Sequence, residues 1–109
     1  MYIVMNRIPV NKDYWSEFEQ RFMQRRGLVD QSPGFVRNLV LRPDDDSSEY
    51  HVVMTLWQTH QAFIDWTESD SFRQDHVQAR ETPKEMYAGR NILEMFEVIS
   101  DSGDRQGQD

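Results

Sequence analysis

Residues 2–10 read YIVMNRIPV, and the alternation of their side chains decides the expected fold. Successive side chains of a β-strand point to opposite faces, so a period of two predicts a strand here. Arg7 lies on the odd side, and because a charged side chain rarely points into a core, we expect the even side to face the interior. That side holds Tyr2, Val4, Asn6, Ile8 and Val10. The strand therefore carries one amide, Asn6, among largely apolar neighbours.

The segments that follow this strand have either the apolar spacing of a helix or the apolar run of a strand. Two segments have the apolar spacing of an amphipathic helix, and three are apolar runs bounded by turn residues. The helical segments are 14–26 and 59–80, and the strands are 35–42, 49–58 and 92–99. Ser69, Asp70 and Ser71 interrupt the second helical segment, because short polar side chains compete for backbone hydrogen bonds. We therefore expect two short helices in that segment.

The order strand, helix, strand, strand, helix, strand predicts an α+β fold of the ferredoxin-like βαββαβ type. In this fold the helices cover one face of an antiparallel sheet. The strands are apolar on both faces, as Ile3 and Met5 show beside the even residues, so the other face would expose an apolar patch. We therefore expect two sheets to pack face to face in a homodimer.

Length and composition limit the function classes. A chain of 109 residues suits one domain, which we place at 1–99, followed by a polar tail over 100–109 that is expected to be disordered. The net charge of −7 argues against nucleic acid and anionic membranes as partners. The absence of cysteine excludes disulfides, thiolate metal sites and a catalytic thiol. With neither a signal peptide nor an apolar run of about 20 residues, the expected location is the cytoplasm.

Asn6 is the first residue that could carry chemistry. Leaving a buried amide unpaired costs about 1–3 kcal/mol, so a partner must exist. One interpretation is a side-chain hydrogen bond to a neighbouring loop. The other is a hydrogen-bond donor that points into a ligand pocket.

His76 and Trp66 lie in the two expected helices of the second helical segment. His76 follows Phe72 by about one turn, which puts it on the inward edge of its helix, as a polar rim residue or as a ligand. A single imidazole is poor for zinc but sufficient for haem, whose porphyrin supplies four nitrogens. Trp66 follows Phe63 at helical spacing, so it is either a core residue or the wall of a cavity for a flat ligand. The break near Ser69 is needed for both to face one cavity. The other two histidines, His51 and His60, are expected on the surface.

The combination of Asn6, Trp66 and His76 resembles the Isd-type haem-degrading monooxygenases of the antibiotic biosynthesis monooxygenase superfamily, which are dimeric α+β barrels. The three residues match that family's site in type, order and spacing, and the resemblance covers about residues 1–99. Residues 32–35, which read SPGF, and Trp57 agree with the wider superfamily and therefore speak for the fold alone.

The resemblance implies that haem, bound non-covalently, is both substrate and oxygen-activating cofactor. His76 would be the proximal iron ligand, Asn6 would donate a hydrogen bond to oxygen on the iron or to the attacked meso region, and Trp66 would hold the porphyrin ruffled. Ring opening and iron release would follow, with O2 as co-substrate and electrons from an external reductase. Cationic side chains must help bind the anionic propionates, and the candidates are Arg25, Arg26 and Arg80. Which meso carbon is cut stays open.

Two other functions fit the same residues. A cofactor-free monooxygenase of a quinol or polyketide-like aromatic would use Asn6 and Trp66 to position its substrate, with His76 incidental. A haem carrier or sensor would use the same pocket without turnover.

Overall fold

The computed structural model describes residues 1–24, 29–79 and 83–104, with backbone alone for 75–79 and 104. It has the expected order of strands and helices, and short 3-10 turns join several of them. The elements are β1 (Tyr2–Ile8), α1 (Trp15–Gln24), β2 (Phe35–Leu41), β3 (His51–Trp57), α2 (His60–Thr67), α3 (Asp70–Ala79) and β4 (Ile92–Glu97). Within these ranges, no helix has both the length and the apolar character that crossing a membrane requires.

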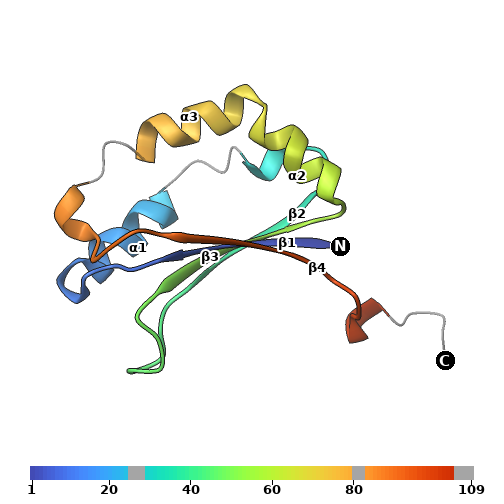
Figure 1. The fold of residues 1–109 in the computed structure, drawn as a ribbon. Helices are drawn as coiled ribbons and strands as arrows, with labels where there is room; N and C mark the ends of the chain where they lie inside the picture. Colours follow the sequence, from blue (N-terminus) through green and yellow to red (C-terminus); the bar gives the residue numbers. More distant parts are fainter. Residues whose placement is uncertain (25–28, 80–82, 105–109) are drawn as a thin grey trace.

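The four strands form one antiparallel sheet in the order β2-β3-β1-β4. Helices α2 and α3 lie together on one side of this sheet (Figure 1). Helix α1 packs on the same side, because Phe18 shares a buried cluster with Ile8 of β1. The α+β, ferredoxin-like fold expected from the sequence is confirmed.

The even residues of β1 face the helices, as the position of Arg7 predicted. Val4 is 6% exposed and belongs to a cluster beneath α2 that includes Phe63. Ile8 is 9% exposed and packs in a second cluster beneath α1. That second cluster also contains Met86, which is 0% exposed and comes from the 3-10 turn Lys84–Met86 in the loop before β4. The loop before β4 therefore contributes to the core.

The second helical segment breaks where the sequence predicted. Helix α2 ends at Thr67 and α3 begins at Asp70. Ser69 makes the break, because its hydroxyl donates to the carbonyl of Trp66 at 2.6 Å and accepts from the backbone N–H of Phe72 at 3.2 Å. One side chain thus satisfies a carbonyl at the end of one helix and an N–H at the start of the next.

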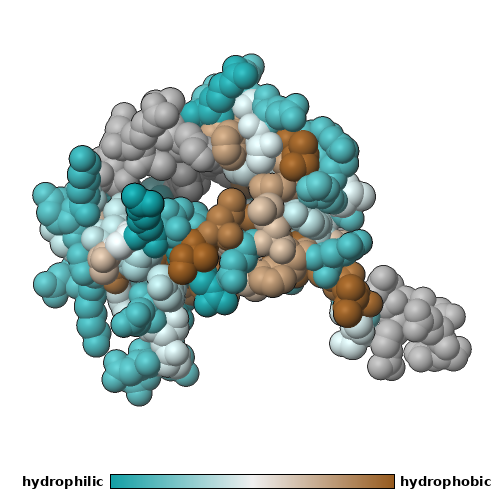
Figure 2. Space-filling model, in the orientation of Figure 1, coloured by the Kyte–Doolittle hydropathy of each residue, from teal (hydrophilic) through white to brown (hydrophobic). Residues whose placement is uncertain are grey.

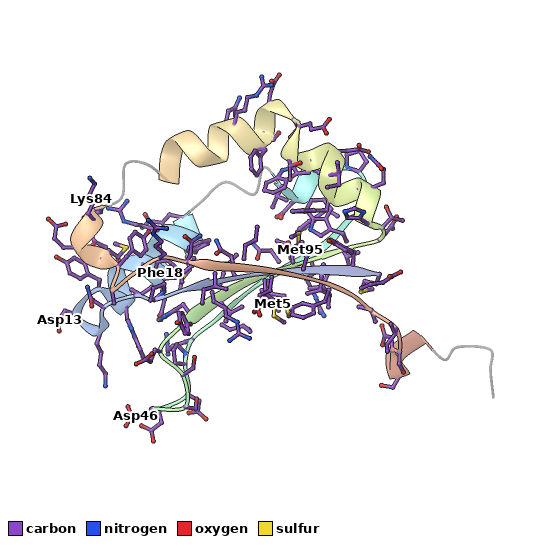
Figure 3. All side chains as sticks on the ribbon, viewed as in Figure 1. Met5, Asp13, Phe18, Asp46, Lys84 and Met95 are labelled. Carbon is purple, nitrogen blue, oxygen red and sulfur yellow. The ribbon has the colours of Figure 1, made fainter. Side chains whose placement is uncertain are left out.

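The sheet face away from the helices is largely apolar, apart from the ion pair between Arg7 and Glu94, and we call it the bare face because nothing covers it in the single chain. Figure 3 shows Met5 on this side and Met95 on the helix side. The register puts Ile3 opposite Phe96, so both lie on the bare face, where Phe96 is 46% exposed. The expectation that the strands are apolar on both faces is therefore confirmed, whereas the homodimer stays a prediction. The disorder expected over 100–109 also stays a prediction, since the described part of that segment contains one 3-10 turn, Ser102–Asp104.

Candidate active site

Asn6 lies in the middle of β1, between Val53 of β3 and Leu93 of β4. Its Oδ1 accepts a hydrogen bond of 2.9 Å from Nδ2 of Asn91, which immediately precedes β4. The side-chain bond to a neighbouring loop, one of the two interpretations of Asn6, is therefore present. That bond occupies only the oxygen, and within the described chain Nδ2 makes no hydrogen bond. The amide thus keeps a donor group on the helix side of the sheet.

The part of the sheet around Asn6 is an open apolar floor, which we define as Leu93 and Met95. Leu93 is 55% exposed and pairs with Asn6, and Met95 is 48% exposed and pairs with Val4, so both lie on the helix side. Figure 2 shows apolar side chains exposed along the sheet, below the helical layer. Exposed apolar side chains beneath a helical layer are the surroundings that an apolar ligand needs.

Trp66 lies in the last turn of α2 and is half-buried. Its ring centroid is 4.8 Å from that of Phe72, edge-on, and 5.7 Å from that of Trp57. The indole packs against the cluster of Val4 and Phe63 and is only half-buried, so both interpretations of Trp66, as a core residue and as a cavity wall, stay open. Its Nε1 is buried without a hydrogen-bond partner in the described structure, an arrangement that costs about 1–3 kcal/mol and is unusual for tryptophan.

The backbone of His76 lies in α3, one helix after Trp66. The break at Ser69 that the geometry required is present, and α3 extends over the sheet (Figure 1). The side chain of His76 lies outside the described part of the structure, as do Arg25, Arg26 and Arg80. The structure thus brings Asn6 and Trp66 to one side of the sheet, whereas the four other candidates keep the status of sequence predictions.

His51 was expected on the surface, and that prediction is wrong. It is 1% exposed, its Nε2 lies 2.8 Å from Oε2 of Glu19, and the rings of Trp15 and Phe18 meet it edge-on. His51 pairs with Ile8 of β1, and this register puts its side chain on the helix face, under α1. The acidic turn before β3 suggested that His51 is exposed to solvent, but its pairing with Ile8 places the side chain in the interior. His60 is exposed, as expected.

Glu19 connects this buried histidine to an exposed cation. The Arg42 side chain is 64% exposed, and its guanidinium forms a bidentate ion pair with the Glu19 carboxylate. This ion pair is the main reason why the pKa of Glu19 falls from 4.5 to about 2. Burial opposes this shift, and the hydrogen bond from His51 adds to it. The ion pair in turn raises the pKa of Arg42. Sequence reasoning missed this network.

The comparison with known protein families decides the family. The model of a family described as antibiotic biosynthesis monooxygenase matches residues 1–78, which is most of the chain. The chain belongs to this family. The matched range contains strand β1 with Asn6, helix α2 with Trp66, and helix α3 up to residue 78, including His76.

Individual known proteins are similar to this chain over most of its length. The protein named "Heme oxygenase (mycobilin-producing)" of Mycobacterium tuberculosis is 35% identical over 101 residues, covering 93% of this chain and 91% of that protein. A "Heme oxygenase (staphylobilin-producing)" of Staphylococcus epidermidis is 36% identical over 77 residues, covering 70% and 73%. The structure of the heme-degrader MhuD from Mycobacterium tuberculosis, with two hemes bound in its active site, superposes with a TM-score of 0.74 at 30% identity, covering 93% of this chain and 98% of that one.

Proposed function

We propose that this protein is a haem-degrading monooxygenase, a haem oxygenase of the non-canonical type. It binds haem without a covalent bond, opens the porphyrin ring with O2 and external electrons, and releases the iron. The observation that carries this proposal is Nδ2 of Asn6, which has no hydrogen-bond partner among the described residues and lies beside an open apolar floor. The chain is also 35% identical over 101 residues to a protein named as a heme oxygenase. The same fold alone would not distinguish this chemistry from others.

The side chains around Asn6 suit a broad, flat and mostly apolar substrate. Ligand pockets are generally lined by apolar side chains with a few placed polar groups. Leu93 and Met95 provide the apolar surface, and Asn6 provides a single amide donor at its edge. Haem combines a large apolar ring with a few polar groups, so the fit is good.

Each of the three candidate residues has a defined task in this proposal. Haem supplies the iron that activates oxygen, and His76 holds that iron through one imidazole nitrogen. Asn6 donates a hydrogen bond where negative charge develops, and a donor that is already oriented needs no reorganisation during the reaction. Trp66 presses on the porphyrin, and its contacts with Trp57 and Phe72 hold the indole in place for this.

The reaction needs partners outside the described chain. No Gly-x-Gly-x-x-Gly follows a strand in the sequence, so we propose an external reductase as the electron donor. Arg25, Arg26 and Arg80 are the proposed partners of the haem propionates. We also propose that two copies pack through their bare sheet faces as a homodimer. The cytoplasmic location remains an expectation.

A titration followed by a turnover experiment tests the function. Apoprotein titrated with hemin should develop a saturable Soret band. After a reductant is added in air, the band should disappear in the presence of catalase, which removes free hydrogen peroxide, and iron should become available to a ferrous chelator. Haem in buffer with the same reductant and catalase is the control for uncatalysed bleaching.

Each rival function predicts a different result. A haem carrier or sensor would bind hemin but keep its Soret band for hours in reductant and air. A cofactor-free monooxygenase would show no saturable Soret band and would consume O2 with a quinol in the absence of iron. Loss of the band only when catalase is omitted would assign the bleaching to peroxide and contradict the proposal.

A further inference from the structure

We propose that Asn91 is a positioning residue that orients the side-chain amide of Asn6, so that the donor nitrogen and not the oxygen is free beside the apolar floor. The catalytic consequence of this orientation rests on the proposed function. The orientation itself rests on one hydrogen bond and can be measured without haem.

The sheet register puts Asn91 next to Asn6. Strands β1 and β4 pair antiparallel with Asn6 opposite Leu93. Asn91 is two residues before Leu93, so it is the diagonal neighbour of Asn6 on the same face of the sheet. Its Nδ2 donates to Asn6 Oδ1 over 2.9 Å. The side chain of Asn91, one residue before β4, thus reaches the side-chain amide of Asn6 in β1.

An asparagine amide needs such a neighbour to have a defined orientation. One side of the planar group accepts hydrogen bonds and the other donates them, and the two differ little in shape. The residues that flank Asn6 across the sheet are Val53 and Leu93, whose apolar side chains cannot distinguish oxygen from nitrogen. When Asn91 donates to the oxygen, the nitrogen is left on the side away from that bond. With Asn91 as the donor, the nitrogen of Asn6 is the atom that a substrate meets.

The loop before β4 holds Asn91 in place. Met86 of this loop is 0% exposed in the core cluster beneath α1. The backbone N–H of Asn11 donates to the carbonyl of Met86 at 2.8 Å, and the N–H of Ala88 donates to the carbonyl of Pro9 at 2.8 Å. These contacts tie the loop to the end of β1, so Asn91 approaches Asn6 from a fixed backbone.

An Asn91→Asp substitution inverts the donor pattern with little change in shape. A carboxylate only accepts hydrogen bonds, so Asn6 must turn its Nδ2 toward residue 91 and leave Oδ1 beside the floor. In the apoprotein, NMR should show the Asn6 side-chain NH2 protons exchanging with water on the order of tenfold more slowly in Asn91→Asp than in the wild type. Protection already present in the wild type, or equal exchange in both proteins, would overturn the assigned orientation.

Turnover and haem affinity test the catalytic consequence. We expect Asn91→Asp to lose on the order of 10²-fold in the rate of haem degradation, as Asn6→Ala should, because both remove one oriented donor. Asn91→Ala only releases the amide and should lose about threefold to tenfold. The dissociation constant for hemin should stay within about threefold in all three variants, because none of them changes the apolar floor or His76, the proposed iron ligand.

Asn38→Asp is the matched control, since it makes the same change of charge on the helix side of β2, at the opposite edge of the sheet. It should leave the amide exchange and the degradation rate unchanged. Slow amide exchange in Asn91→Asp with wild-type turnover would overturn the positioning role while leaving haem degradation intact. A wild-type protein that degrades no haem would instead remove the proposed function, and the apoprotein NMR experiment would still decide the orientation.

Discussion

His51 Nε2 lies 2.8 Å from Oε2 of Glu19, and this hydrogen bond joins strand β3 to helix α1 inside the protein. The histidine is 1% exposed, whereas the glutamate side chain is 14% exposed and also binds Arg42 at the surface. The carboxylate is therefore held in its charged form by a partner on each side. This arrangement makes the stability of the fold depend on pH in a defined range.

Glu19→Gln should reduce stability at neutral pH and have progressively less effect in acid. The pKa of Glu19 is lowered to about 2 in the folded protein, against 4.5 when unperturbed. A lowered pKa contributes stability that is fully present above the unfolded value and is lost as pH falls through the folded value, here from about pH 5 to pH 2. We expect the variant to lose about 1–2 kcal/mol at pH 7, less than the full shift implies because Arg42 is exposed to solvent.

Urea denaturation of wild type and variant at several pH values measures this difference. Glu17→Gln is the control, because Glu17 lies on the same helix and its one ion pair within the described residues is an exposed contact of 3.8 Å with Arg21. Its effect should stay within about 0.5 kcal/mol throughout the range. A constant difference between wild type and Glu19→Gln from pH 7 to pH 3 would contradict the assignment.

His51→Ala should destabilise the protein by about 2–4 kcal/mol, because it opens a cavity between Trp15 and Phe18 and removes a hydrogen bond. His51→Gln keeps a donor for Glu19 and should cost less, about 1–2 kcal/mol. His60→Ala is the control at an exposed position and should change stability by about 0.5 kcal/mol or less. Urea unfolding curves measure the stability of the variants. Equal midpoints for His51→Ala and His60→Ala would mean that His51 is not buried in solution.

Local patterns and long-range contacts explain what the sequence could and could not predict. The strand with Asn6 and the break at Ser69 could be predicted from the spacing and chemistry of side chains within a few residues, and both predictions are confirmed. The burial of His51 depends on its pairing with Ile8 of a distant strand, which no local pattern contains. The bond from Asn91 to Asn6 joins residues separated by 85 positions, so the loop before β4 could not be interpreted from sequence.

His76→Ala should abolish or strongly shift the Soret band of the hemin complex, because His76 is the proposed protein ligand of the iron. Absorbance titration of apoprotein with hemin measures the change, and circular dichroism verifies that the variant is folded. His60→Ala is a matched control, since it removes an exposed histidine at the start of α2. Its band should match that of the wild type. A wild-type band in His76→Ala would remove the ligand assignment and leave the pocket without an identified iron ligand.

Phe96→Glu should convert the protein from a dimer to a monomer, if the bare sheet face is the contact between two copies. Phe96 lies opposite Ile3 on that face and is 46% exposed in the single chain. A glutamate there could not be buried between two sheets without losing its hydration, which costs far more than a surface position does. Light scattering during size-exclusion chromatography should give twice the chain mass for the wild type and the single chain mass for the variant. Met23→Glu, which changes a 79% exposed methionine on α1, should stay dimeric. A dimeric Phe96→Glu would place the contact on another surface, and a monomeric wild type would show that the bare face has no partner copy.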